Sequence, residues 1–375
     1  MQRTMQTLMQ RTVIALAVIA GAAQAETAWL ETEKTKLKIE TIASGLAHPW
    51  GMTMLPDGSL LVTERDGRLR SVSPDGQVSA PITGLPAMAV AGQGGLLDVL
   101  ADKNFASNKR IYFSYSEPAA GNTSSTAVAS AILDGQQLNE PRVLFSQQPK
   151  VDSKYHFGGR LVQTAEGTLF ITLGDRGSER QQVQKLDTTI GKVVHITADG
   201  QPASGNPFIG NNKASALVWS YGHRNIQGAT LDNNGRLWTH EHGPQGGDEI
   251  NIAVAGKNYG WPLITYGEEY GGGVIGKTSQ DGLEQPLHYW VPSIAPSGMV
   301  FYQTTLFAPW QHNLLVGSLK FGQLVRLEIK QDKVVHEERI RLGKRIRDIE
   351  VAPDGALLLL TDEDNGALLR LTPAT

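Results

Sequence analysis

The chain has 375 residues, a formal net charge of -3 and no cysteine. The charge leaves no basic surface for nucleic acid, and the lack of cysteine excludes disulfides and thiolate chemistry. Hydrophobic residues make up 40% of the chain, which is enough for a large core, and 41 glycines favour a turn-rich β fold.

The first 25 residues predict a cleaved secretory signal peptide. Arg3 and Arg11 form its positive flank, residues 13–23 form an apolar run, and residues 23–25 (AQA) have the A-x-A form of a cleavage site. The run is too short for a membrane-spanning helix, which needs about 20 residues, and no later stretch is long and apolar enough. We therefore expect an exported protein without a membrane span, most simply a periplasmic one.

One pattern recurs along the rest of the chain: two alternating apolar–polar strands joined by a polar turn. Its six copies span 52–63, 96–115, 161–172, 228–239, 299–317 and 349–361. Such pairs are typical of β-hairpins, and several copies are followed by a third strand, as at 68–72, 324–329 and 368–371. Units of this length and number predict an all-β, six-bladed β-propeller that forms one domain over residues 36–374.

Little of the sequence departs from this repeat. Helix is expected only at 178–186, as a turn or two. The glycine-rich stretch 266–286 has no alternation, so it predicts an insertion loop. Because a propeller brings the loops of all its blades to one axis, residues far apart in the sequence can meet at one mouth.

Polar motifs lie at the ends of the predicted strands, most densely over residues 219–261. One turn in this stretch carries Arg224, Asn225 and Gln227, whose guanidinium and amide groups suit an anionic or polar ligand. The next, 241–249, combines carboxylates with glycines and a proline, which free carbonyl oxygens for Ca²⁺. This density is typical of the mouth of a pocket.

Two residues near the third hairpin are candidates for acid–base chemistry. His156 precedes two glycines, and a neutral imidazole suits proton abstraction near pH 7, although a surface loop residue is the other interpretation. Asp175 follows the strand 169–173, where it either caps a turn or orients a histidine or ligand.

Further cations adjoin the last two hairpins, in Ser318-Leu319-Lys320 and in 345–348 (RIRD). Arg345 and Arg347 alternate, so they lie on the same face of an extended strand. Two guanidiniums on one face repel each other unless an anion lies between them. With Arg224 and Lys320 they predict a site for a small polyanion, and cross-blade ion pairs with Asp and Glu are the alternative.

All of these residues except Asp175 belong to eight ordered motifs: HPWGM (48–52), GQGGLLD (92–98), HFGGRL (156–161), GHRNIQG (222–228), EHGPQGGDEIN (241–251), NYGWP (258–262), SLK (318–320) and RIRD (345–348). In these motifs the chain resembles the soluble pyrroloquinoline quinone (PQQ) dehydrogenases of the glucose/sorbosone dehydrogenase family, and within it the bacterial periplasmic aldose sugar dehydrogenases. The resemblance implies a six-bladed propeller that uses PQQ and Ca²⁺ to oxidise aldoses at C1 to aldonolactones. Electrons then pass to an external acceptor.

The resemblance also implies roles for individual residues. His156 is implied as the catalytic base, Asp175 as the carboxylate beside it, and Arg224 as the group that stabilises the developing oxyanion. The residues implied to hold PQQ are Gln93, Arg224, Asn225, Gln227, Tyr270, Ser318, Lys320, Arg345 and Arg347. The implied Ca²⁺ ligands are the carbonyls of Gly243 and Pro244 at the PQQ-linked ion, and Glu249 with the carbonyl of Tyr259 at a second ion. Tyr155 replaces an acid of the glucose-specific members, which implies a broader range of aldoses.

Two other functions fit a propeller of this kind. A Ca²⁺-dependent lactonase needs a metal and a base but no set of cations. A non-catalytic exported propeller that binds sugars or peptides needs aromatic platforms but no base. The preferred sugar, the electron acceptor and the oligomeric state, monomer or homodimer, stay open at this point.

Overall fold

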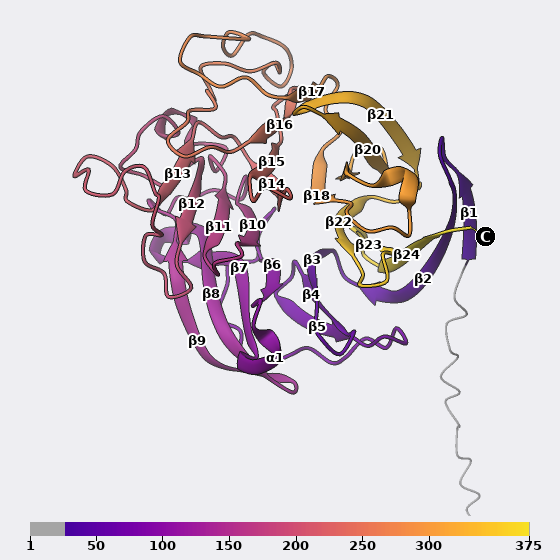
Figure 1. Cartoon of the computed structure of the whole chain (residues 1–375). Helices are drawn as coiled ribbons and strands as arrows, with labels where there is room; N and C mark the ends of the chain where they lie inside the picture. The colour runs from indigo at the N-terminus through magenta and orange to yellow at the C-terminus, as the bar shows by residue number, and fades with distance from the viewer. Residues whose placement is uncertain (1–26, 375) are drawn as a thin grey trace, which may run out of the picture.

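A computed structural model describes residues 27–374. The predicted signal peptide lies outside the described residues. Strands make up nearly all of the regular structure and form six sheets arranged around a centre (Figure 1). The predicted all-β, six-bladed propeller is therefore confirmed.

We number the sheets as blades in chain order. Blade 1 has three strands: β3 (Pro49–Met54), β4 (Leu60–Glu64) and β5 (Arg68–Val72). Blade 2 has β6 (Leu96–Ala101), β7 (Arg110–Pro118), β8 (Ser124–Asp134) and β9 (Gln137–Ser146), and blade 3 has β10 (Gly158–Gln163), β11 (Leu169–Leu173), β12 (Lys192–Ile196) and β13 (Val218–Tyr221). Blade 4 has β14 (Ile226–Leu231), β15 (Leu237–Glu241), β16 (Asp248–Ile252) and β17 (His288–Trp290), and blade 5 has β18 (Pro296–Phe301), β19 (Asn313–Ser318), β20 (Gln323–Lys330) and β21 (Lys333–Arg341). Each of the six predicted hairpins corresponds to the first two strands of a blade.

Blade 6 joins the two ends of the described chain. Its own strands are β22 (Ile346–Val351), β23 (Leu357–Thr361) and β24 (Gly366–Pro373), and β2 (Lys36–Leu46) pairs antiparallel with β24. β1 (Thr27–Glu31) adds a fifth strand outside β2. Because N- and C-terminal strands share this sheet, the ring of blades is closed by main-chain hydrogen bonds.

The first strands of the blades line the axis. Each contacts the first strand of the next blade, and β22 contacts β3 to complete the ring. Loops that precede a first strand and follow a second strand therefore gather at one face of the propeller, which we call the upper face. The hairpin turns lie at the opposite face.

The second strands are buried on both sides, since they lie between neighbouring blades. All five residues of β11 and of β23 are buried. Side chains of adjacent blades pack together, as Trp238 and Ile250 of blade 4 do with Leu314 and Val316 of blade 5. This packing explains the continuous apolar runs in these strands.

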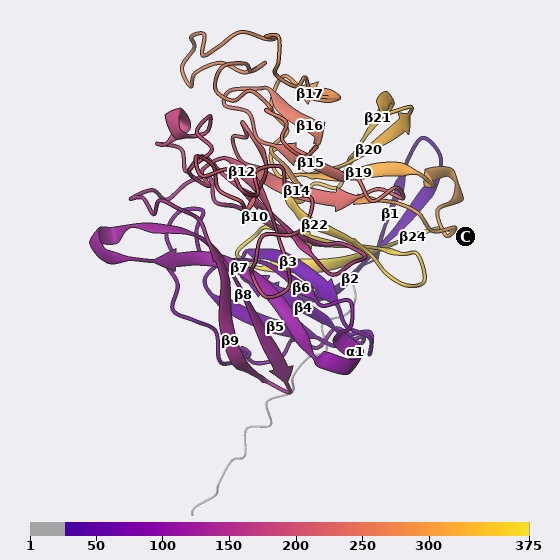
Figure 2. The same cartoon turned by 60° about the vertical axis from the view of Figure 1, so that its left-hand side comes forward.

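Helical structure is sparse, as expected. The segment 178–186 contains one 3₁₀ turn, Arg180–Gln182. Three further short helices, α1 (Phe105–Asn108), Ala120–Asn122 and Ala308–Trp310, were not predicted. The stretch 266–286 contains no strand and forms part of the long loop between β16 and β17, which projects from the body of the propeller (Figure 2). None of the helices in the described part of the chain is long and apolar enough to cross a membrane.

A backbone irregularity recurs at the upper end of every first strand. The pairing register shifts between Pro49 and Met52 in blade 1, and at the equivalent place in each other blade. In blades 4 and 6 the shift leaves one extra residue, Gln227 and Arg347 respectively. Such β-bulges redirect a side chain and are frequent next to active sites.

Candidate active site

His156 and Asp175 form a hydrogen-bonded pair at the upper face. His156 lies just before β10 with a left-handed backbone (φ 50°), and its Nδ1 lies 2.6 Å from Asp175 Oδ1. Since a carboxylate accepts, Nδ1 carries a proton, and in the neutral imidazole Nε2 then has the lone pair. Nε2 makes no hydrogen bond within residues 27–374. The arrangement fits the predicted base and its orienting carboxylate.

The Asp175 carboxylate is buried, with 1% of the residue exposed, and it has three donors. Besides His156, it accepts hydrogen bonds from Gly177 N (2.7 Å) and from the indole Nε1 of Trp261 (2.8 Å). Burial raises its pKa, but the hydrogen bond and charge of His156 and the charge of Arg224 outweigh burial and hold that pKa below its usual range. Asp175 is therefore ionised at neutral pH. Trp261 was not among the predicted site residues.

A cavity of about 440 Å³ lies beside this pair. Its lining comes from blades 1, 4, 5 and 6 and from the loop before blade 2, and consists of Trp50, Arg65, Gln93, Gln227, His242, Ala295, Leu319, Lys320, Arg345, Arg347 and Asp362. Gln93 joins the cavity to the base, because its Oε1 accepts a hydrogen bond from His156 N (2.8 Å). Five of the predicted PQQ-binding residues thus meet in one cavity.

The two bulge residues contact each other in this cavity. Arg347 Nη1 donates to Gln227 Oε1 (3.1 Å), and Nη2 donates to Asp362 Oδ2 (2.6 Å). Arg345 Nη2 reaches the same Asp362 oxygen at 3.3 Å. Arg345 and Arg347 therefore lie on the same side of the strand, as predicted. The alternative prediction, ion pairs with acidic residues, also holds in part, because both guanidiniums contact Asp362.

The cavity nevertheless keeps an excess of positive charge. Its lining has four cationic side chains, Arg65, Lys320, Arg345 and Arg347, and one carboxylate, Asp362. Arg65 and Asp362 were not predicted as site residues from the sequence. A small polyanion is the ligand that this charge pattern favours.

Arg224 lies in a narrow adjoining pocket with Glu241, Glu249 and Tyr259. Its Nη1 donates to the carbonyls of His242 (3.0 Å) and Gly243 (2.7 Å), while its Nε is buried without a partner. A buried donor without a partner is costly unless a ligand supplies the acceptor. Arg224 therefore retains at least its Nε–H for a bound group.

The expected Ca²⁺ ligands can be compared with this pocket. Glu249 is buried and accepts one side-chain hydrogen bond, from Asn251 Nδ2 (3.1 Å). Burial, then the nearby charges of Glu241 and Asp248, raise the pKa of Glu249 well above its usual value. The Oδ1 of Asn251 is buried without a partner. Buried, poorly compensated oxygens of this kind fit a hard cation.

Side chains alone do not complete a metal site in the described part of the chain. No three His, Cys, Asp or Glu residues there cluster so that they could hold a metal ion. A bound Ca²⁺ would need main-chain oxygens, as expected for Gly243, Pro244 and Tyr259. The Gly243 carbonyl uses one lone pair for Arg224 and has a second available.

Besides Arg224, three predicted PQQ-binding residues lie outside the lining of the cationic cavity. Ser318 is fully buried, and its hydroxyl donates to the Ile294 carbonyl (2.7 Å). Asn225 Oδ1 accepts from Gly158 N (3.1 Å), which supports the backbone next to His156. Tyr270, 73% exposed, lines a neighbouring cavity of about 430 Å³ that also contains Pro244 and Lys320.

A charged cluster lies next to the cavity on the axis. The Arg160 guanidinium lies 4.5 Å from the ring centre of Trp50, and its Nη1 contacts Asp98 (3.1 Å) and Asp348 (3.0 Å). Burial and Asp348 raise the pKa of Asp98 to about 6, against the lowering charge of Arg160. Because Arg160 bridges two carboxylates on the first strands of blades 2 and 6, we assign this cluster to the packing of the inner strands.

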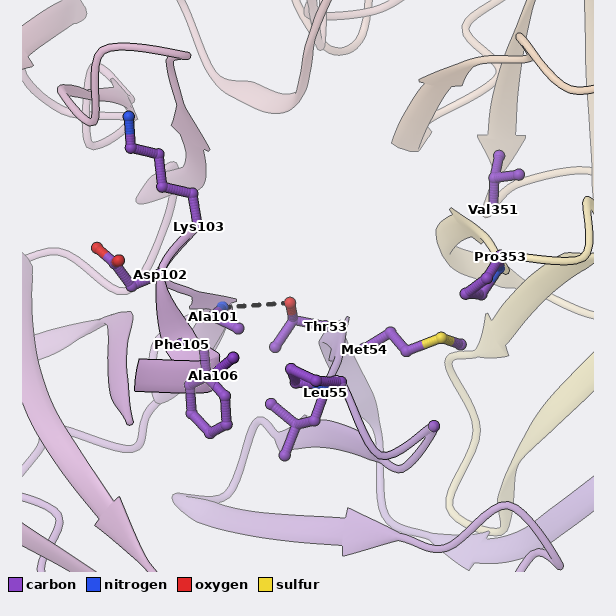
Figure 3. Close-up of a pocket in the computed structure, with 12 residues that line it drawn as sticks. Thr53, Met54, Leu55, Ala101, Asp102, Lys103, Phe105, Ala106, Val351 and Pro353 are labelled. Carbon is purple, nitrogen blue, oxygen red and sulfur yellow. Dashed lines mark hydrogen bonds between the residues drawn. The ribbon is translucent and has the colours of Figure 1, made fainter. Parts of the chain in front are cut away.

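A separate cavity of about 480 Å³ lies at the opposite face (Figure 3). Its lining comes from the lower ends of first strands and their turns, including Met54, Asp102, Phe105 and Val351. No predicted site residue lines it. The candidate chemistry is therefore confined to the upper face.

Fold and site together define a class of protein: a six-bladed propeller with a paired histidine beside a cationic cavity on its axis. The sequence matches the glucose/sorbosone dehydrogenase family over residues 46–370, so the chain belongs to that family. The predicted family membership is confirmed, and so is the enzyme class, a sugar-oxidising oxidoreductase.

Individual relatives agree with this assignment. The aldose sugar dehydrogenase YliI of Escherichia coli (strain K12) is 43% identical over 90% of this chain and 93% of its own length. The apo crystal structure of the soluble aldose sugar dehydrogenase from Escherichia coli superposes with a TM-score of 0.87 at 42% identity, covering 90% of this chain and 100% of that one. The PQQ-bound aldose sugar dehydrogenase of Streptomyces coelicolor gives 0.74 at 27% identity, over 94% of this chain and 100% of that one.

Proposed function

We propose that this protein is a periplasmic, PQQ- and Ca²⁺-dependent aldose dehydrogenase that oxidises the C1 hydroxyl of aldoses to aldonolactones. The observation that carries the proposal is the position of a base beside a polyanion site. His156 has an unpaired Nε2, Asp175 fixes its tautomer, and Gln93 joins it to a cavity with four cations and one carboxylate. The PQQ-bound relative supports the choice of ligand.

The residues of the cavity fit PQQ, which is a planar quinone with three carboxylates. Lys320, Arg345 and Arg347 would bind carboxylates through charge-assisted hydrogen bonds. Arg224, through its unpartnered Nε, would bind where negative charge develops. When bound, PQQ supplies a two-electron acceptor for the C1 hydride and Ca²⁺ supplies a Lewis acid beside it.

The protein's own contribution is proton transfer and orientation. His156 Nε2 takes the proton of the C1 hydroxyl as the C1–H bond breaks, and the imidazolium that forms is stabilised by the Asp175 carboxylate. Asp175 acts as a positioning residue, and its hydrogen bond from Trp261 fixes the carboxylate in turn. The proton then leaves through solvent, and an external acceptor removes the two electrons.

Calcium completes the proposal at two places. The carbonyls of Gly243 and Pro244 would bind one ion next to PQQ. Glu249 and the Tyr259 carbonyl would bind the second, where a cation would supply the counter-charge that the buried Glu249 carboxyl lacks. Tyr155, exposed beside the base, leaves room for different aldoses.

Reconstitution tests the proposal directly. Apo-protein is incubated with PQQ and Ca²⁺, and sugar-dependent dye reduction and lactone formation are followed with several aldoses. We expect activity only with both PQQ and Ca²⁺, loss on chelation, and recovery when Ca²⁺ is restored. Metal-dependent lactone hydrolysis without PQQ would identify a lactonase instead, and sugar binding without turnover would identify a binding protein.

A further inference from the structure

Arg65 is a cation of the cavity that no sequence motif pointed to. It follows the last residue of β4 in blade 1, and its backbone is fixed on both sides. Its N–H donates to the His48 carbonyl (3.1 Å), and its own carbonyl accepts from Leu96 N (3.2 Å). A side chain at Gly95 would collide with that carbonyl, so this glycine is required for the close approach of blades 1 and 2.

The Arg65 side chain differs from its neighbours in having no partner. Arg68 Nε and Arg70 Nη1 both contact the buried carboxylate of Glu64, at 2.7 and 3.3 Å. Within residues 27–374 the Arg65 guanidinium makes no hydrogen bond and no ion pair, although it lines the cavity. A half-buried guanidinium with five donors and no acceptor is poorly satisfied.

Its surroundings carry the same charge. Burial lowers the pKa of Arg347, and the carboxylate of Asp362 opposes this effect. The positive charges of Arg65 and Arg345 lower the pKa of Arg347 further. Arg65 is thus close enough to repel Arg347. The one cavity carboxylate, Asp362, already has hydrogen bonds from Arg347, Arg345 and His48 Nδ1 (2.8 Å). An added anion would relieve the positive charge that Asp362 leaves uncompensated.

We propose that Arg65 is a further ligand-binding residue of this site and that it binds a carboxylate of the anionic cofactor from the side of blade 1. The inference rests on the proposed function. The charge of the lining supports it: with Arg65 included, the lining has three more positive than negative side chains, and an anion with several carboxylates would offset this excess.

Cofactor binding by the apo-protein, in the presence of Ca²⁺, provides the test. PQQ is titrated by quenching of tryptophan fluorescence into wild type, Arg65→Gln and Arg341→Gln at several salt concentrations. Arg341 is exposed at the end of β21, so its change removes the same charge away from the cavity. We expect Arg65→Gln to bind about 10- to 100-fold more weakly, with a smaller salt dependence. Arg341→Gln should bind like wild type.

A second variant separates charge from folding. Arg65→Lys keeps the charge and should retain most of the affinity, and the thermal midpoint of each variant reports its folding. The inference is overturned if Arg65→Gln binds PQQ as wild type does, or if Arg65→Lys loses as much affinity as Arg65→Gln. Either result leaves the proposed function standing, whereas failure of the wild type to bind PQQ would remove both.

Discussion

Replacing Asp175 with asparagine tests how the base is held. The aspartate accepts three hydrogen bonds: His156 Nδ1 and Gly177 N share Oδ1, and Trp261 Nε1 contacts Oδ2. Asparagine has one acceptor oxygen and one NH₂ group. If the oxygen serves His156 and Gly177, the NH₂ group faces the indole N–H, and two donors oppose each other in a buried place.

The size of the effect follows from these contacts. The unsatisfied Trp261 N–H costs about 1–3 kcal/mol of folding free energy. The lost charge no longer stabilises the imidazolium that forms when His156 takes a proton. We therefore expect kcat of Asp175→Asn to fall by about 10²–10⁴-fold, while the affinity for PQQ changes little.

Trp261→Phe provides the matched change, because it removes the indole N–H and keeps an aromatic ring. In the double variant no donors oppose each other, so its loss of stability should be smaller than the sum of the two single losses. A coupling of about 0.5–3 kcal/mol is expected. The turnover of the double variant should stay at the level of Asp175→Asn, since the charge is still missing.

Urea unfolding of the four proteins gives the stabilities, and dye reduction at saturating PQQ gives kcat. Strictly additive stability losses would show that the indole does not act through Asp175. A kcat of Asp175→Asn within a few-fold of wild type would refute the role of the carboxylate.

Further predictions concern the base, the metal and pH. His156→Ala should bind PQQ nearly as well as wild type but lose about 10²–10⁴-fold in kcat. Arg347→Ala should instead bind PQQ about 1.5–3 kcal/mol more weakly, and excess cofactor should restore part of its activity. Dye reduction measured as a function of PQQ concentration distinguishes the two, and near-normal turnover of His156→Ala would place the base elsewhere. Glu249→Gln should abolish the rise in thermal midpoint that Ca²⁺ gives the wild type, and an unchanged rise would exclude Glu249 as a ligand. Burial lowers the pKa of Lys192 from 10.5 to about 7, although the charge of Asp187 acts in the opposite direction. Between about pH 7 and pH 10.5 the unfolded chain therefore binds a proton at Lys192 that the folded chain has lost, so the folding stability rises with pH. The unfolding free energy of wild type minus that of Lys192→Met should therefore rise by up to about 1.4 kcal/mol per pH unit in that window. Urea unfolding at about pH 7 and 9 measures this difference, and the same difference at both pH values would contradict the prediction.

The hairpins were predictable because their determinants are local. Alternation and D-G or N-G turns act over a dozen residues, so each pair of strands is encoded in its own segment. The closure of the ring is different. β2 pairs with β24, more than 300 residues away, through main-chain hydrogen bonds that leave no pattern in 36–46. Only the finished ring selects that pairing.

The site was predictable where chemistry and position coincide. His156 and Asp175 flank the third hairpin, so the fold brings them together wherever the hairpin forms. The role of Trp261 could not be inferred in this way, because its indole reaches Asp175 from another blade. Ser318 lies two residues before Lys320 in the sequence, but its hydroxyl, at the end of β19, donates to the Ile294 carbonyl and does not face the cavity that Lys320 lines.

A positional rule would have found two of the missed residues, Arg65 and Asp362. In blades 1, 4, 5 and 6 the last residue of the second strand pairs with the first residue of the first strand, just before the bulge. The next residues in these blades are Arg65, His242, Leu319 and Asp362, and all four line the cavity. The strand is buried on both sides up to that point, so the first residue beyond it is the first whose side chain can reach the axis. Arg65 and Asp362 look like ordinary surface charges in their own segments, and only alignment of the hairpins by their upper ends shows that they occupy equivalent places around one cavity.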